Sequence, residues 1–140
     1  MTKIALDTNV LIYLHEIDPG SEKRRIANEL IAGSPLISSQ VVSEYLNVCN
    51  KRLKMTKQDS LDSLMGWLPF CNLAVFEIAI FNAAIRLIEK YQFQMFDGIV
   101  VASALGSGCS ILYSEDMQHG LSVEKKLKII NPFINIKNGV

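Results

Sequence analysis

The sequence predicts an α/β fold in which a mainly parallel central sheet of four to five strands carries helices on both faces. Short apolar runs alternate along the chain with longer segments whose apolar residues recur at helical spacing. Strands that alternate with helices in this way indicate parallel strands joined by helical crossovers. We find no internal repeat and no linker, so a single domain over residues 1–140 is the simplest organisation.

Each strand is predicted from a short apolar run that ends at a polar or turn-forming residue. The expected strands are residues 3–6, 36–38, 73–76, 110–113 and 128–130. The first is apolar throughout, which suits the buried centre of a parallel sheet. The last stands before Asn131-Pro132, and we expect it at an edge of the sheet.

Each helix is predicted from apolar residues three and four positions apart, between capping and breaking residues. The expected helices are residues 10–17, 22–32, 40–53, 57–68, 77–91 and 99–105. Ile78, Phe81, Ile85 and Ile88 form an apolar stripe on the helix at 77–91, and we expect this stripe to pack in the core. The stripes of the helices that open at Gln40 and Thr56 exceed the needs of one small core, which hints at an interface.

The composition indicates a folded protein without a strong general attraction to polyanions. Hydrophobic residues make up 49% of the chain and charged residues 20%, as in an ordinary folded protein. The 14 basic and 14 acidic residues cancel, so a nucleic acid would have to be bound by a local patch or through a metal ion. Two basic clusters, Lys23-Arg24-Arg25 and Lys51 to Lys57, are expected to be a solvated helix face and a helix end.

The cysteines and histidines do not have the spacing of a structural zinc site. There is no Cys-x-x-Cys pair among Cys49, Cys71 and Cys109, and His15 and His119 are far apart in the sequence. Free thiols fit a reducing compartment. We see neither the pattern of a secretory signal nor an apolar run of roughly 18 residues. We therefore expect a soluble cytoplasmic protein with no membrane association.

Four carboxylates occupy positions from which they could converge. Asp7 and Asp116 each follow a predicted strand, and the carboxyl ends of parallel strands share one edge of the sheet, where ligands bind. Asp97 opens a buried helix, and Glu44 points along an apolar stripe. Three of them also have a simpler role: Asp7 and Asp97 could cap helices, and Glu44 could reach water from the edge of its stripe.

Convergence of the four carboxylates would require cations, because like charges so close repel one another. Hard divalent ions such as Mg²⁺ and Mn²⁺ take oxygen ligands of this kind. Such a metal activates water and stabilises the charge that develops on a phosphate under attack. A site of this composition is suited to phosphodiester hydrolysis.

These motifs resemble those of PIN-domain ribonucleases, and more narrowly of VapC-type toxins from bacterial toxin–antitoxin pairs. The resemblance rests on short segments in a specific order: Asp7-Thr8-Asn9, Glu44 after Ser38-Ser39-Gln40-Val41-Val42, Phe96-Asp97-Gly98, and Ser114 to Gly120. It implies an α/β/α three-layer sandwich and an endoribonuclease that depends on Mg²⁺ or Mn²⁺. It further implies an RNA substrate, a homodimer, and a small antitoxin that blocks the acidic site.

Carried over residue by residue, the resemblance assigns roles to six positions. Asp7, Glu44, Asp97 and Asp116 match the acidic quartet that holds metal and carries catalysis, and Asn9 and Ser114 match supporting polar positions. The sequence departs from the family pattern at Gly98, where Ala is common. Glu115 adds a further carboxylate, which we expect to face solvent.

Two other functions are weighed against this one. A phosphatase of the haloacid dehalogenase type also places an Asp after its first strand, but it needs a second Asp two residues later, where this chain has Asn9. A PIN-like module that binds RNA or protein without cleavage would be indicated by the loss of one acidic residue. None of the four is lost.

Overall fold

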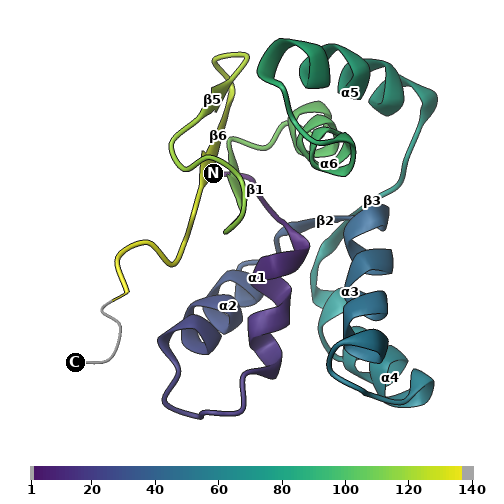
Figure 1. Ribbon diagram of the computed structural model, residues 1–140, viewed down its shortest axis with the longest axis vertical. Coiled ribbons are helices and arrows are strands. Elements are labelled where there is room, and N and C mark those ends of the chain that lie inside the picture. The colour runs from purple at the N-terminus through teal and green to yellow at the C-terminus, as the bar shows by residue number, and fades with distance from the viewer. Residues whose placement is uncertain (1, 137–140) are drawn as a thin grey trace.

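The structure, a computed structural model, describes residues 2–136, and within them six strands form one sheet (Figure 1). The strand order is β3-β2-β1-β4-β6-β5, and neighbouring strands run parallel except β5 and β6. The strands are β1 (Ile4–Leu6), β2 (Leu36–Ser38), β3 (Asn72–Ala74), β4 (Ile111–Tyr113), β5 (Ser122–Val123) and β6 (Leu127–Ile130).

Helices cover both faces of this sheet. They are α1 (Thr8–Ile12), η1 (Tyr13–His15), α2 (Glu22–Ala32), α3 (Ser39–Lys51), α4 (Lys57–Trp67), η2 (Leu68–Phe70), α5 (Ile78–Tyr91) and α6 (Met95–Gly106), where η marks a 3₁₀ turn. In Figure 1, α5 and α6 lie together on one side of the sheet, and α1 to α4 lie on the other. The predicted α/β/α three-layer sandwich is therefore confirmed.

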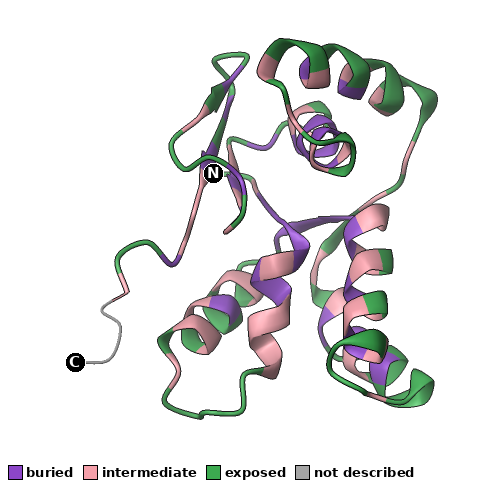
Figure 2. Cartoon of the chain, viewed as in Figure 1, coloured by how far each residue is buried: buried purple, intermediate pink, exposed green. Residues whose placement is uncertain are grey.

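The core lies where the central strands meet the helices on both faces. Leu6 of β1, Ile37 of β2 and Leu112 of β4 are all fully buried. Figure 2 shows the buried residues concentrated along these strands and around α6, which is apolar on nearly every side, as its sequence predicts. Within residues 2–136 no helix is both long and apolar enough to cross a membrane.

The far edge of the sheet differs from the prediction. β6 was expected at the edge, but this expectation is wrong because the two-residue strand β5 pairs antiparallel with it. Glu124 and Lys125 make the connecting turn with positive φ angles of 52° and 57°. A strand of two residues has too little alternation to be recognised from sequence, and positive φ at two non-glycine residues is uncommon.

The apolar stripe of α5 was expected in the core, and this expectation is wrong for Ile78, Phe81 and Ile85, whereas Ile88 does pack against the core. Ile78 and Ile85 are 80% and 58% exposed, and the buried residues of the helix are Ala84 and Leu87. The reason is close packing of α5 against α6. A Cβ atom at Gly98 would overlap the Ile88 side chain, so the glycine allows α6 to approach this closely. The side of α5 that carries Ala84, Leu87 and Ile88 therefore faces inward.

Candidate active site

The register of β1 and β4 places the first two polar residues of the site side by side. Leu6 pairs with Tyr113, so Asp7 and Ser114, the next residues of each chain segment, are neighbours. The Ser114 hydroxyl donates to Asp7 Oδ2 at 2.9 Å, and the backbone N–H of Thr8 donates to Asp7 Oδ1 at 2.8 Å. Asp7 thus caps α1, which was the simpler of its two expected roles. It also lies at the carboxyl edge of the sheet, where the site was expected.

Burial is the main influence on the pKa of the Asp7 carboxyl. The residue is only 6% exposed, and loss of hydration raises the pKa of its carboxyl to about 6. Hydrogen bonds from Ser114 and Thr8 oppose this rise, and the charges of Asp97 and Glu44 add to it. The Asp7 carboxyl therefore interacts electrostatically with Asp97 and Glu44, two other members of the predicted quartet.

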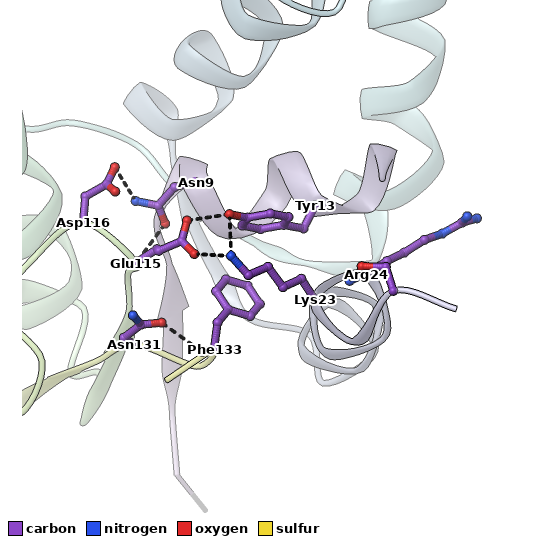
Figure 3. Close-up of polar contacts among 9 residues, drawn as sticks. Asn9, Tyr13, Lys23, Arg24, Glu115, Asp116, Asn131 and Phe133 are labelled. Carbon is purple, nitrogen blue, oxygen red and sulfur yellow. Dashed lines mark hydrogen bonds and ion pairs between the residues drawn. The ribbon is translucent and has the colours of Figure 1, made fainter. Parts of the chain in front are cut away.

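Asn9 joins the ends of β1 and β4. Its side-chain Nδ2 donates to Asp116 Oδ2 at 3.2 Å and, at 3.4 Å each, to Asp7 Oδ2 and Ser114 Oγ. Its Oδ1 accepts from the backbone N–H of Glu115 at 3.0 Å. Figure 3 shows the Asn9 side chain between Asp116 and Glu115. Asp116 is exposed, so Asn9 ties a solvent-facing carboxylate to a buried one.

Glu44 reaches the same region from α3. Ser38 caps this helix through a bond from the Val41 N–H, which fixes where the helix starts after β2. The half-buried Glu44 carboxylate accepts from Thr8 Oγ1 at 2.7 Å and from Gln40 Nε2 at 2.9 Å. It is therefore partnered by protein donors and does not simply extend into water from its stripe.

Asp97 lies in the first turn of α6 and is half-buried. The helix begins at Met95, four residues earlier than predicted, and its N-cap is Gln94. Asp97 is therefore not the capping residue. Burial raises the pKa of the Asp97 carboxyl, and the charges of Glu44 and Asp116 raise it further. Gln40 Nε2 also donates to the Phe96 carbonyl at 3.3 Å, which links α3 to the start of α6.

Comparison with known proteins identifies the family. The PIN domain family model matches residues 4–120, a span that includes all four carboxylates. The chain belongs to the PIN-domain family. Comparison with curated proteins gives no match at the level of sequence.

Solved structures with the same fold include several toxins. A toxin–antitoxin complex from Klebsiella pneumoniae is 18% identical, with a TM-score of 0.68 over 94% of this chain and 98% of that chain. The Mycobacterium tuberculosis toxin VapC20, which cleaves the sarcin–ricin loop, is 17% identical, with a TM-score of 0.64 over 81% and 90%. VapBC2 from Rickettsia felis, bound to a promoter DNA fragment, is 18% identical, with a TM-score of 0.67 over 92% and 97%. The predicted likeness to VapC-type PIN domains is thus confirmed for family and fold.

The donor set of this PIN domain fits a hard divalent cation, but the carboxylates are held apart. Burial raises the pKa of Asp7 and of Asp97, and the charges of neighbouring carboxylates at this end of the sheet add to both rises. Within residues 2–136, however, no group of three or more His, Cys, Asp or Glu side chains is arranged to hold a metal ion. Mutual repulsion favours such spacing, and cation binding would require these side chains to move closer together.

A cavity of about 380 Å³ opens from the acidic site of the PIN domain. Asn9, Glu115 and Asp116 line it at the site, and Tyr13 and Arg52 are among the residues that line the rest of it. Arg52 belongs to the second basic cluster, which the sequence assigned to a helix end. Arg52 is the C-cap of α3, which confirms the helix end, and it also borders the cavity that leads to the carboxylates.

Sequence reasoning missed four partners of the site and misjudged Glu115. Thr8 and Gln40 hold Glu44, and Tyr13 and Lys23 hold the Glu115 carboxylate. The expectation that Glu115 and Lys23 face solvent is wrong, because they pair with each other at 2.9 Å. Gln40 stands four residues before Glu44 on one helix, a spacing that could have indicated this contact. No local signal predicts the other three.

Proposed function

We propose that this PIN domain is a metal-dependent endoribonuclease and the toxin of a toxin–antitoxin pair. The observation that supports this most is the gathering of Asp7, Glu44, Asp97 and Asp116 at one end of the sheet. Burial raises the pKa of Asp7 to about 6 and also raises that of Asp97, and neighbouring carboxylates add to both rises, so a bound cation would favour the charged forms of these two residues. Within residues 2–136 none of the four carboxylates forms an ion pair, and a metal-binding role would explain why negative charges without a nearby cation are kept together.

In this proposal the four carboxylates hold Mg²⁺ or Mn²⁺, and the residues around them set their positions. When bound, such an ion activates water and stabilises negative charge on a phosphate under attack. Ser114 and Asn9 hold Asp7 through donated hydrogen bonds, and Thr8 and Gln40 hold Glu44. These donors limit the rotation of two ligands before any metal arrives.

The cavity beside Asp116 gives the RNA a path to the site. Within residues 2–136 Arg52 forms no ion pair, so its guanidinium is available to a phosphate. Tyr13 and Ile12 provide apolar wall in the same cavity. Because the chain has no net charge, such a local contact would have to supply much of the attraction for RNA.

The partners follow from the relatives and from the exposed apolar face. Structures with the same fold are described as toxin–antitoxin complexes, which supports an antitoxin as partner. Leu61 and Met65 of α4, and Ile78 and Phe81 of α5, are large apolar side chains exposed to solvent, which supports a homodimer. The free thiols of all three cysteines agree with a cytoplasmic location.

The activity is tested with purified protein and a structured RNA. Cleavage is expected in Mg²⁺ or Mn²⁺ and should cease when EDTA is added, then return with excess metal. Cleavage that persists undiminished in EDTA would contradict the metal-dependent mechanism. For the assembly, light scattering at tens of micromolar, roughly a typical range for interface affinities, should give twice the chain mass of 15.6 kDa. A mass of one chain would count against the homodimer.

One observation favours the alternative of a binding module without cleavage. The carboxylates of the described residues are not already arranged around a metal position. If the protein binds RNA but fails to cut it in either metal, and its melting temperature does not respond to Mn²⁺, this second function replaces the first.

A further inference from the structure

The Glu115 carboxylate is bound by two side chains from other parts of the chain. Tyr13 of η1 donates its hydroxyl to Glu115 Oε1 at 2.6 Å, and Lys23 Nζ of α2 lies 2.9 Å from Oε2. Lys23 Nζ also donates to the Tyr13 hydroxyl at 3.1 Å, which closes a triangle of polar contacts (Figure 3). Exposure is limited to 33% for the Lys23 side chain and 24% for that of Glu115. We call Tyr13, Lys23, Glu115 and Phe133 the Lys23 cluster.

Aromatic rings shield this ion pair. Lys23 Nζ lies 4.7 Å from the ring centroid of Tyr13 and 5.5 Å from that of Phe133. The two rings meet edge to face, with centroids 4.8 Å apart, and Phe133 is buried. A salt bridge in open solvent contributes little and is rarely fixed in place. Here the cation–π contacts and the phenol bond hold both partners in one geometry.

The Lys23 cluster is linked to the acidic site through the backbone of Glu115. The Glu115 N–H donates to Asn9 Oδ1 at 3.0 Å, which determines how the Asn9 amide is oriented. With the oxygen engaged there, Asn9 Nδ2 is directed at Asp116 and Asp7. The opposite orientation would place the amide oxygen against two carboxylates and would be repelled. Glu115 also precedes Asp116 directly, so one anchored residue determines both positions.

We propose that Lys23 is a positioning residue of the acidic site, acting through Glu115 on the Asn9 amide and the Asp116 carboxylate. The catalytic consequence rests on the proposed function, whereas the ordering of Glu115 and Asn9 does not. Lys23 lies outside the cavity beside Asp116, so its removal should affect the arrangement of the site and leave RNA contacts in the cavity intact.

The test compares Lys23→Met with Arg24→Met on the same helix. Met keeps most of the unbranched apolar stem of either side chain and removes its charge. Within residues 2–136 the Arg24 side chain donates only to the backbone carbonyl of Glu16, and it points away from the Lys23 cluster in Figure 3, so Arg24 is the matched control. Lys23→Arg, which can still pair with Glu115, should rescue the loss.

Two measurements need no RNA. In metal-free protein, hydrogen exchange of the Glu115 backbone amide should be about tenfold faster in Lys23→Met than in the wild type or Arg24→Met. Mn²⁺ affinity, measured by titration calorimetry without RNA, should fall roughly tenfold, since supporting partners of metal ligands typically affect affinity on that scale. In the cleavage assay kcat should fall about tenfold with KM nearly unchanged.

Several outcomes would overturn the proposal. The first is hydrogen exchange of the Glu115 amide that is the same in Lys23→Met and in the wild type. The second is a loss of Mn²⁺ affinity and kcat in Arg24→Met as large as in Lys23→Met. The third is faster Glu115 exchange in Lys23→Met while its Mn²⁺ affinity and kcat stay at the wild-type values. If the wild type neither binds Mn²⁺ nor cleaves RNA, the proposed function fails, and the exchange comparison alone still decides the role of Lys23. If Lys23→Met does not fold, Tyr13→Phe, which removes one hydroxyl, should give the same faster exchange, and wild-type exchange there would contradict the proposal.

Discussion

The acidic site has two halves that are supported differently. The strand half consists of Asp7, Asn9, Ser114 and Asp116, which follow β1 and β4 and are joined by hydrogen bonds. The helix half consists of Glu44 on α3 and Asp97 on α6. Glu44 has two donors, but within residues 2–136 Asp97 accepts no side-chain hydrogen bond.

The difference shows what fixes a functional side chain. Neighbouring parallel strands place the residues that follow them a fixed distance apart, so Asp7 and Ser114 meet wherever β1 and β4 pair. A helical carboxylate depends on how its helix packs. Asp97 is brought in by α6, whose place depends on close contact with α5 at Gly98. We therefore expect the strand half to be the rigid part and the helix half to respond more to metal.

The largest effect is expected when the helix half loses Asp97. Asp97→Asn should lower RNA cleavage by about 1,000-fold, roughly 4 kcal/mol of transition-state stabilisation. Without metal the variant should melt at the wild-type temperature or higher, because one repelling charge is gone, and Mn²⁺ should raise its melting temperature less. Calorimetry and a gel-based cleavage assay measure these effects.

The matched control is Asp62→Asn on α4, an exposed Asp that accepts only from Gln58. It should leave cleavage and the metal response as in the wild type. Full activity in Asp97→Asn would remove Asp97 from the site and with it the functional distinction between the two halves.

The next effect concerns Asp7 in the strand half. Its pKa rises from the ordinary 3.8 to about 6, so its favourable contribution to folding is complete below pH 3.8 and is lost as pH rises through 6. The loss amounts to roughly 3 kcal/mol. Urea unfolding of metal-free protein should therefore show stability that falls between about pH 4 and 7, whereas Asp7→Asn should lack this component.

Other groups titrate in the same range, so the comparison with Asp7→Asn carries the test. Burial lowers the pKa of His15, which makes its contribution opposite in sign: full above the unfolded value of 6.5 and lost as pH falls. That contribution is present in both proteins and cancels in the difference. If the free energy of unfolding depends on pH in the same way in both proteins, ionisation of Asp7 does not destabilise the fold, and the prediction is wrong.

The smallest effect is expected when each half loses one hydroxyl that donates to its carboxylate. Ser114→Ala removes a fully buried donor to Asp7 and an acceptor for the Met117 N–H, and should cost about 2 kcal/mol. Thr8→Val removes the donor to Glu44 with little change of shape and should cost about 1 kcal/mol, because Glu44 keeps its bond from Gln40. Denaturant midpoints measure both, and a larger cost for Thr8→Val would reverse the assignment of the rigid half.

The sequence prediction follows the same division. Asp7 and Asp116 were predicted as site residues because a strand end is visible as an apolar run followed by a carboxylate. Glu44 was predicted from helical periodicity and Asp97 from its place at the start of a buried helix, although the start of α6 was misplaced by four residues because Gln94 caps it without a side-chain bond. Glu115 and Lys23 were assigned to solvent because their pairing joins positions 92 residues apart. Such a contact leaves no local pattern.

The sequence by itself determined the alternation of strands and helices and pointed to the four carboxylates that we assign to the site. These depend on neighbours within a few positions, where periodicity and capping chemistry act. The tertiary structure alone decided which side of α5 is buried, that β6 is interior, and that Lys23 grips Glu115. These depend on which distant surfaces meet, and that is settled by the packing of the whole chain.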